Sequence, residues 1–340
     1  MDTFYISADG GQSWSALPVP DGVTLSSPLT CASAAWCAAG GLYHGRQPVF
    51  LTSRDGHSWT ITPLPGGTGQ IVQLDCPTAL VCRGLEWSTG QLLAANFPLQ
   101  TDMQFIGTDD SGRHFSVTAF PRGESIESLS CPTVTSCAAV GVFDASGPVY
   151  DHGRTWNFDR PDMQGIVLTT RNAGVSWQPG TFPRDAGAGP FPDITCPDAS
   201  HCWLIDSVGT DAGSNSPNHT QVVVSSDGGA TWTSRRLPPN QSFPEFSTVT
   251  CPTAATCYAA AEVPRTIPGR ITAALYATHD AGRTWSLVTF ARPAKIPAGM
   301  ASDSFMSIGN IQCPAPAACV ALGVVDQGQK ITPVYTTGSP

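Results

Sequence analysis

Six short cysteine pairs with one common spacing constrain this chain more than any other feature. The two members of every pair are separated by five residues, and five of the six pairs begin Cys-Pro. The first cysteines recur at intervals of 45, 55, 65, 55 and 62 residues, so the chain consists of repeated units. The pairs are Cys31/Cys37, Cys76/Cys82, Cys131/Cys137, Cys196/Cys202, Cys251/Cys257 and Cys313/Cys319.

The spacing favours a disulfide across a tight turn in each unit. Zinc sites prefer two to four residues between cysteines and need a second ligand arm. This chain does not supply such an arm at regular positions. Bound metal and free buried thiols are the alternatives, and we expect neither a metal nor a cofactor. Six disulfides require an oxidising compartment, so we expect a secreted or envelope-exposed protein. The first residues, MDTFYISADGG, do not form a signal peptide, which indicates a removed leader or a fragment.

A second motif alternates with the cysteine pairs. It combines Ser or Thr, an Asp or Asn two residues later, a Gly and then Trp or Phe, and it follows an apolar run of β-forming residues. This pattern predicts strand, turn and strand. The carboxylate or amide accepts N–H groups of its own turn, the glycine adopts positive φ, and the aromatic ring packs between units. These structural roles fall on Asp9, Asp55, Asp110, Asn172, Asp227 and Asp280.

The motif resembles the Asp-box, or BNR, repeat of sialidase-like β-propellers. The resemblance implies an all-β fold in which each box lies on the turn between the third and fourth strands, C and D, of a four-stranded blade. It also implies that the boxes are structural, because they recur in proteins of many activities. With one cysteine pair on the turn between strands A and B, we expect six blades with one hairpin disulfide each.

Five complete blades fit between Cys31 and Asp280, and the sixth is split between the termini. We expect residues 1–340 to form one domain, its ring closed by N-terminal strands within 3–18 and C-terminal strands within 306–337. Two segments fit this scheme poorly. Residues 331–337 resemble an additional strand C, and a further box at Asp151 indicates an inserted hairpin or, as the alternative, a seventh blade.

Composition excludes several functions. Hydrophobic residues make up 41% of the chain, which allows a large core, but no apolar run is long enough for a membrane span. The formal net charge of −9 argues against nucleic acid and anionic membranes as partners. We therefore expect a protein or carbohydrate ligand, while the oligomeric state is left open.

Loop lengths separate the two ends of each unit. Cysteine turns and boxes are uniform and lie at one end, here called the Asp-box end. The B–C and D–A loops vary in length and lie at the opposite end, here called the variable end. Because scaffolds carry function on variable loops, binding is expected there. Candidate binding residues are Tyr43, Arg46, Arg83, Trp87, Arg122, Arg160, Arg184, Arg265 and Arg270.

An exo-sialidase-like glycoside hydrolase is the alternative function. Sialidases clamp a carboxylate with three arginines and use a Tyr nucleophile with a Glu partner. The first of those arginines belongs to an Arg-Ile-Pro motif before the first box, where this chain has only MDTFYI. The nearest match, Arg265-Thr-Ile-Pro268, has an extra residue and lies far downstream. A binding module is therefore favoured over an enzyme, and no catalytic residue is assigned.

Overall fold

The computed structural model contains strands and turns, and no α-helix occurs in the part of the chain that it describes. The described residues are 3–6, 15–33, 36–55, 58–87, 103–121, 125–144, 163–181, 193–208, 219–236, 245–264, 271–288, 305–315, 318–326 and 331–338. The predicted all-β class is confirmed. The chain divides into two compact units, one holding residues 1–6 and 14–181 and the other residues 7–13 and 182–340.

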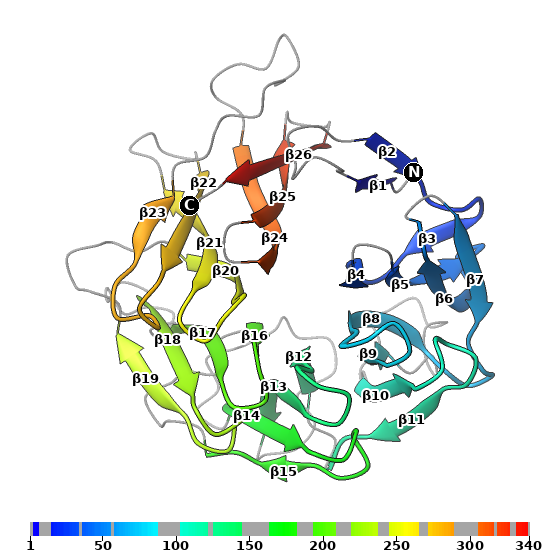
Figure 1. Cartoon of the computed structure of the whole chain (residues 1–340), viewed down its shortest axis with the longest axis horizontal. Helices are drawn as coiled ribbons and strands as arrows, with labels where there is room; N and C mark the ends of the chain where they lie inside the picture. The colour runs from blue at the N-terminus through cyan, green and yellow to red at the C-terminus, as the bar shows by residue number, and fades with distance from the viewer. Residues whose placement is uncertain are drawn as a thin grey trace. The chain divides into compact units, whose positions relative to one another are not determined.

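Three antiparallel sheets follow one another in the first unit, in consecutive chain order (Figure 1). In the first of them the inner strand is interrupted, so that β3 and β4 both pair with β5. Its strands are β3 (Val23–Leu25), β4 (Thr30–Ser33), β5 (Trp36–Tyr43), β6 (Gln47–Ser53) and β7 (Trp59–Pro63). The second has β8 (Gln70–Asp75), β9 (Cys82–Trp87), β10 (Met103–Thr108) and β11 (Ser116–Ala119). The third has β12 (Ser125–Ser130), β13 (Cys137–Asp144), β14 (Met163–Thr170) and β15 (Gln178–Pro179).

The second unit repeats the same arrangement twice. One sheet has β16 (Asp193–Thr195), β17 (Cys202–Val208), β18 (His219–Ser225) and β19 (Thr233–Arg236). The next has β20 (Glu245–Thr250), β21 (Cys257–Pro264), β22 (Ile271–Thr278) and β23 (Ser286–Val288). The five complete four-strand units predicted between Cys31 and Asp280 are therefore present, with strands A to D in chain order.

The strands near the two chain termini form a separate hairpin and an extension of the last sheet. A two-stranded hairpin is made by β1 (Thr3–Ile6) and β2 (Ser15–Pro18). At the other terminus, β24 (Phe305–Ala315), β25 (Ala318–Asp326) and β26 (Ile331–Gly338) are antiparallel, and a single parallel pair, Thr272 with Met306, joins β24 to β22. The tail forms β26, the last strand in the order of the seven-stranded sheet that this pair makes with β20–β23. Ring closure by the termini stays a prediction, and the box at Asp151 lies outside the described residues.

Disulfides confirm the cysteine prediction in five repeats. Each joins the end of the first strand to the start of the second strand of the same sheet, with Cα–Cα distances of 4.0 to 4.1 Å. The side chains of Cys313 and Cys319 are outside the described part, so the sixth bridge stays a prediction. The pairs that are bridged are Cys31–Cys37, Cys76–Cys82, Cys131–Cys137, Cys196–Cys202 and Cys251–Cys257.

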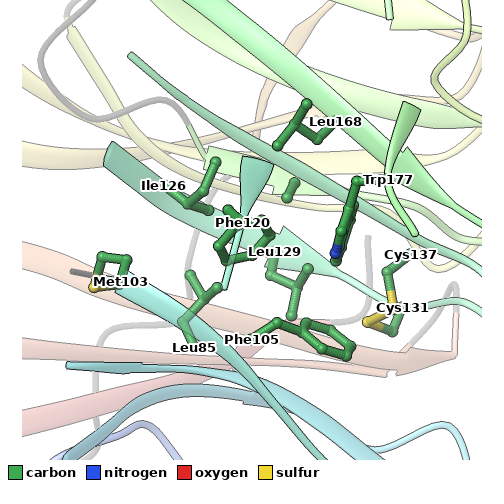
Figure 2. Close-up of a cluster of buried hydrophobic side chains, with 11 residues drawn as sticks. Leu85, Met103, Phe105, Phe120, Ile126, Leu129, Cys131, Cys137, Leu168 and Trp177 are labelled. Atoms are coloured by element: carbon green, nitrogen blue, oxygen red, sulfur yellow. A yellow bond between two sulfur atoms is a disulfide. The ribbon is translucent and has the colours of Figure 1, made fainter. Parts of the chain in front are cut away.

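The core lies between successive sheets. Phe105 of β10 makes edge contacts with Phe120 and with the box residue Trp177, whose ring centroid is 5.3 Å away (Figure 2). Aromatic pairs of this geometry contribute about 0.5–1.5 kcal/mol each beyond the burial of their area. Trp177 belongs to the sheet β12–β15, so the box aromatic does pack between neighbouring units, as its size and position predicted.

Polar side chains join the inner strands of adjacent sheets. Gln73 of β8 accepts the N–H of Leu129 at 2.9 Å and donates to the carbonyl of Leu129 at 3.1 Å. Asp193 of β16 accepts the N–H of Val249 in the same relative position of the second unit, at 3.0 Å. Both acceptors lie three residues before the first cysteine of their repeat. These side chains therefore pair with backbone groups of the next inner strand, which in a continuous sheet would pair with the backbone of a neighbouring strand.

Candidate functional site

The Asp-box turns are closed networks of hydrogen bonds. In the turn at Asp280, the Thr278 hydroxyl donates to the carboxylate at 2.9 Å and accepts the N–H of Gly282 at 2.8 Å. The carboxylate also accepts the N–H and the hydroxyl of Thr284, at 2.9 and 2.6 Å. These hydrogen bonds lower the pKa of Asp280 to about 2, those from the Thr284 hydroxyl and N–H first. The hydroxyl and glycine contacts recur in the boxes at Asp110, Asn172 and Asp227, where the acceptor is a carboxylate or, in Asn172, the amide oxygen.

The box at Asp55 is one residue shorter and closes differently. Its carboxylate accepts the N–H of Ser58, three residues later, at 2.7 Å, whereas the longer boxes use the fourth residue. The hydroxyl of Ser53 still donates to it, at 3.2 Å. Asp9, in the first box, lies outside the described residues.

Each longer box is also tied to the cysteine turn of its own sheet. The N–H of Ala281 donates to the carbonyl of Ala255, at 2.9 Å, and Ala255 lies inside the Cys251–Cys257 loop. Corresponding bonds run from Ser111 to Leu80, from Ala173 to Thr135 and from Gly228 to Ser200. Boxes and cysteine turns therefore lie together at one end of each sheet, as the loop lengths predicted.

Gly174 is fixed by packing as well as by backbone conformation. Its φ is +83°, and a Cβ atom at this position would lie 2.1 Å from the ring of Phe105 in the preceding sheet. The box glycine therefore seats an aromatic ring of the neighbouring sheet. Sequence reasoning assigned only the positive φ, because no local pattern shows which ring of another repeat lies over the turn.

The structure places Arg83 at the Asp-box end, not at the variable end where the sequence analysis put it. Arg83 directly follows Cys82 in β9, and its side chain is 3% exposed. The guanidinium donates to the carbonyls of Thr108 and Val134 and to the carboxylate of Asp109. It therefore joins the box of one sheet to the cysteine turn of the next. The sequence does contain a signal for this location, because Arg83 directly follows Cys82, a cysteine of the uniform turns at the Asp-box end.

Tyr43 and Arg46 lie at the variable end of the first sheet. They flank the tight β5–β6 turn, in which His44 has a φ of 51° and its ring centroid lies 4.1 Å from that of Tyr43. The N–H of His44 donates to the carbonyl of Gly22, in the β2–β3 connection, at 2.6 Å. The B–C and D–A connections thus meet at this end. Arg46 is exposed on this turn.

Trp87 occupies the same position in the second sheet as Tyr43 in the first. Tyr43 pairs with the first residue of β3, and Trp87 pairs with the first residue of β8. The side chain of Trp87 is 41% exposed, in contrast to the buried box residues Trp177, Trp232 and Trp285. Two aromatic side chains therefore stand at equivalent points of adjacent sheets.

Beside Trp87, Glu86 is completely buried. Its Oε2 accepts the N–H of Gly69 in the β7–β8 connection, and its Oε1 has no hydrogen-bond partner among the described residues. Only glycine fits at position 69, because a Cβ atom there would overlap the backbone carbonyl of Trp87. Burial raises the pKa of Glu86, against the opposing effect of the Gly69 hydrogen bond. The burial of Glu86 depends on this loop, which comes from the preceding sheet.

Glu127 is a second carboxyl group that lacks a described partner. It is the extra residue of a β-bulge in β12, between Ile126 and Ser128, and its Oε2 is buried without a hydrogen bond. Burial raises the pKa of Glu127 to about 8. The bulges in β8, β20 and β24 place Val72, Ser247 and Gly309 at the corresponding position, four residues before the first cysteine. Among these bulges only the one in β12 carries an ionisable side chain.

The remaining predicted residues lie outside the described part of the chain. They are Arg122, Arg160, Arg184, Arg265 and Arg270, and the near match to the Arg-Ile-Pro motif lies there as well. Among the described residues no group of three or more metal-ligating side chains occurs.

Comparison with known proteins identifies the repeat and the fold. The BNR/Asp-box repeat model matches residues 5–16, which contain the first box. Among solved structures, YCF48 bound to D1 peptide aligns over 99% of this chain and 85% of its own, with 16% identity and a TM-score of 0.56. The chain contains a BNR/Asp-box repeat and has the β-propeller fold. None of the curated proteins matches its sequence.

Two similar structures are glycoside hydrolases. The α-L-arabinofuranosidase from Fusarium graminearum, in complex with an iminosugar inhibitor, is 12% identical, with 94% of each chain covered and a TM-score of 0.50. The GH74 enzyme of Niastella koreensis is also 12% identical, with a TM-score of 0.55. The alignment covers 97% of the Asp-box protein but only 48% of that enzyme. At these identities the likeness establishes the fold alone.

Proposed function

We propose that this Asp-box protein is a secreted binding module that takes a protein or carbohydrate ligand at its variable end. The observation that carries the proposal is the pair of aromatic residues Tyr43 and Trp87, at equivalent positions of adjacent sheets, with Trp87 exposed. Arg46 adds a donor beside Tyr43. Exposed aromatic side chains beside polar groups suit both peptide and sugar ligands.

The contacts at the Asp-box end are structural, which supports a binding role for the opposite end. Its carboxylates, hydroxyls and Arg83 are engaged in hydrogen bonds that hold turns and adjacent sheets together. The similar structures include a protein bound to a peptide and enzymes of carbohydrates, so the fold accommodates both ligand classes. Five disulfides fit an extracellular or other oxidising environment. No helix in the described part is long and apolar enough to span a membrane.

The proposed scaffold is a six-bladed ring of residues 1–340. The hairpin β1–β2 would supply the closing strands beside β24–β26, and the sixth cysteine pair would bridge the last A–B turn. Arg122, Arg160, Arg184, Arg265 and Arg270 belong to the proposed binding end because they occur in its variable loops.

Array screening of the oxidised protein tests the binding proposal. Immobilised glycans and peptides are probed with wild type, Trp87→Ala and Val175→Ala, the last altering a residue that is 78% exposed at the Asp-box end. We expect binding that falls at least tenfold with Trp87→Ala and is unchanged with Val175→Ala. Binding lost only with Val175→Ala would contradict the proposal, as would no retained ligand of either class.

A glycoside hydrolase is the second candidate, favoured by the two enzymes of similar fold and by the acid Glu127 with its raised pKa. Fluorogenic sialoside and arabinofuranoside substrates distinguish the candidates. Turnover that disappears in Glu127→Gln would establish catalysis, while binding without turnover supports the module.

A further inference from the structure

The first disulfide, Cys31–Cys37, is more exposed than the other four described bridges. Cys31 is exposed to solvent and Cys37 is half-buried. Every cysteine of the other four bridges is buried, with at most 7% of its surface exposed. Among the five bridges that the structure describes, the first is therefore the one that an attacking thiol reaches most easily.

Aromatic packing accounts for the burial of later bridges. Phe105 of β10 lies in one buried cluster with Cys131 and Cys137 of the following sheet (Figure 2). The bridges of the sheets β8–β11 and β20–β23 share clusters in the same way with Phe50 and Trp203, which come from the sheet before each. None of these three clusters contains a residue of the first bridge.

The chain around the first bridge also differs from the other repeats. Cys31 is followed by Ala32, whereas the first cysteine of each of the other five pairs is followed by Pro. Proline fixes its φ, so those turns begin more rigidly than the turn at Cys31. In this sheet the inner strand is also interrupted, and β4 pairs with β5 at Thr30, Cys31 and Ser33. The bridge is thus one of the three positions at which this short strand is paired.

We propose that Cys31–Cys37 is a thiol-exchange site, at which a dithiol reductant opens the first bridge and leaves the four buried bridges intact. Exposed disulfides are the ones that exchange, because an attacking thiolate must reach a sulfur atom. Opening the bridge removes one tie between β4 and β5, which makes β4 a redox-sensitive segment of the first sheet. The inference is independent of the ligand proposed for the variable end.

The exchange proceeds in two displacements at sulfur. A thiolate of the reductant attacks the Sγ of Cys31, so that a mixed disulfide forms and the bond to Cys37 breaks. Cys37 leaves as a thiolate and takes a proton from solvent. The second thiolate of the reductant then attacks its partner sulfur in the mixed disulfide, which releases Cys31 as a thiolate that is protonated in turn. Two electrons pass from the dithiol, which becomes a disulfide, to the cystine of the protein.

Differential alkylation of the wild-type chain tests the site. The oxidised full chain is incubated with dithiothreitol under native conditions, and free thiols are trapped at intervals with iodoacetamide. The chain is then unfolded, fully reduced and treated with heavy-isotope iodoacetamide, so that peptide mass spectrometry gives the reduced fraction of each cysteine. We expect Cys31–Cys37 to open at least tenfold faster than each of the four buried bridges. Equal rates, or a buried bridge that opens first, would overturn the site.

The same reaction in denaturant is the control for exposure. There the five bridges should open at similar rates, because the fold no longer protects four of them. A first bridge that keeps its full advantage in the unfolded chain would show that its local sequence, not its exposure, sets the rate, and would reject the argument from the fold.

Hydrogen exchange tests the effect on β4. The double variant Cys31→Ser with Cys37→Ser represents the opened bridge, and its amides from Thr30 to Ser33 should exchange at least tenfold faster than in oxidised wild type. The amides of β10, in the next sheet, should be unchanged. Unchanged exchange in β4 would refute its release, as would an equal acceleration in β10, which would indicate loss of the fold instead of a local opening.

Discussion

At the scale of single residues, conformation and packing act together at the box glycine. Gly174 has a φ of +83° and lies against the ring of Phe105, so it meets two independent demands that no other residue satisfies. Gly66, in the exposed β7–β8 connection, has open space around its Cα. The two positions provide a matched comparison.

Gly174→Ala should lower the free energy of unfolding by about 3 kcal/mol, because the added methyl group displaces Phe105 and strains the turn. Gly66→Ala should change it by less than about 1 kcal/mol. Chemical denaturation of both oxidised variants checks the difference. Equal effects of the two substitutions would show that the box glycine is not packed against the neighbouring sheet.

Glu127 should make stability depend on pH. Its pKa is raised to about 8 in the folded chain, so the folded state keeps a proton that the unfolded state releases near pH 4.5. Stability is therefore greatest at low pH and falls as the pH rises from about 4.5 to about 8. Glu127→Gln should remove this loss, roughly 2–3 kcal/mol after allowance for partial burial. Thermal unfolding of both proteins from pH 5 to pH 9 measures it, and parallel profiles would refute a buried acid.

At the scale of the elements, the box and the cysteine turn form one clamp at the end of each sheet. The box carboxylate organises the C–D turn, and the turn then donates to a carbonyl inside the cysteine loop. Asn172 replaces the usual Asp in one repeat and keeps the contact to the N–H four residues later, at 3.0 Å. The amide oxygen is therefore sufficient, and charge is secondary.

Asp280→Asn should consequently cost little at neutral pH, whereas Asp280→Ala should cost about 1–2 kcal/mol through the lost hydrogen bonds of Thr278 and Thr284. The lowered pKa, about 2, gives wild type a contribution to stability that is present above pH 4 and lost as the pH falls toward 2. Asp280→Asn should lack this acid-dependent loss. Denaturation at pH 7 and pH 3 tests both statements, and an Asn variant as unstable as Ala would contradict them.

Local repetition explains which elements the sequence could predict. The spacing of the cysteines and boxes predicts six blades with six hairpin disulfides, of which five four-stranded units and five disulfides are described. It also predicts the separation of turns from variable loops, since each of these features depends on contacts within one repeat. Arg83, Glu86 and Glu127 depend on contacts between repeats or on a bulge. Arg83 therefore resembles an exposed loop residue in the sequence but is buried in the structure, and no local pattern predicts the burial of the two glutamates.

At the scale of the whole molecule, the last cysteine pair should complete the disulfide pattern. Cys313 and Cys319 have the same spacing as the five bridged pairs and flank the β24–β25 turn. Peptide mapping under non-reducing conditions should therefore recover six local links and no link between different pairs. A free thiol pair or bound zinc at Cys313 and Cys319 would contradict the assignment.

Binding at one end of the molecule presupposes that the sheets close into a single ring. A crystal structure of the oxidised full chain tests this claim most directly. We predict six blades around one axis, with β1–β2 completing the sheet of β24–β26 and with Tyr43 and Trp87 at the same end of the ring. Two separately folded units, a seventh blade, or an N-terminal hairpin unpaired with β24–β26 would contradict it.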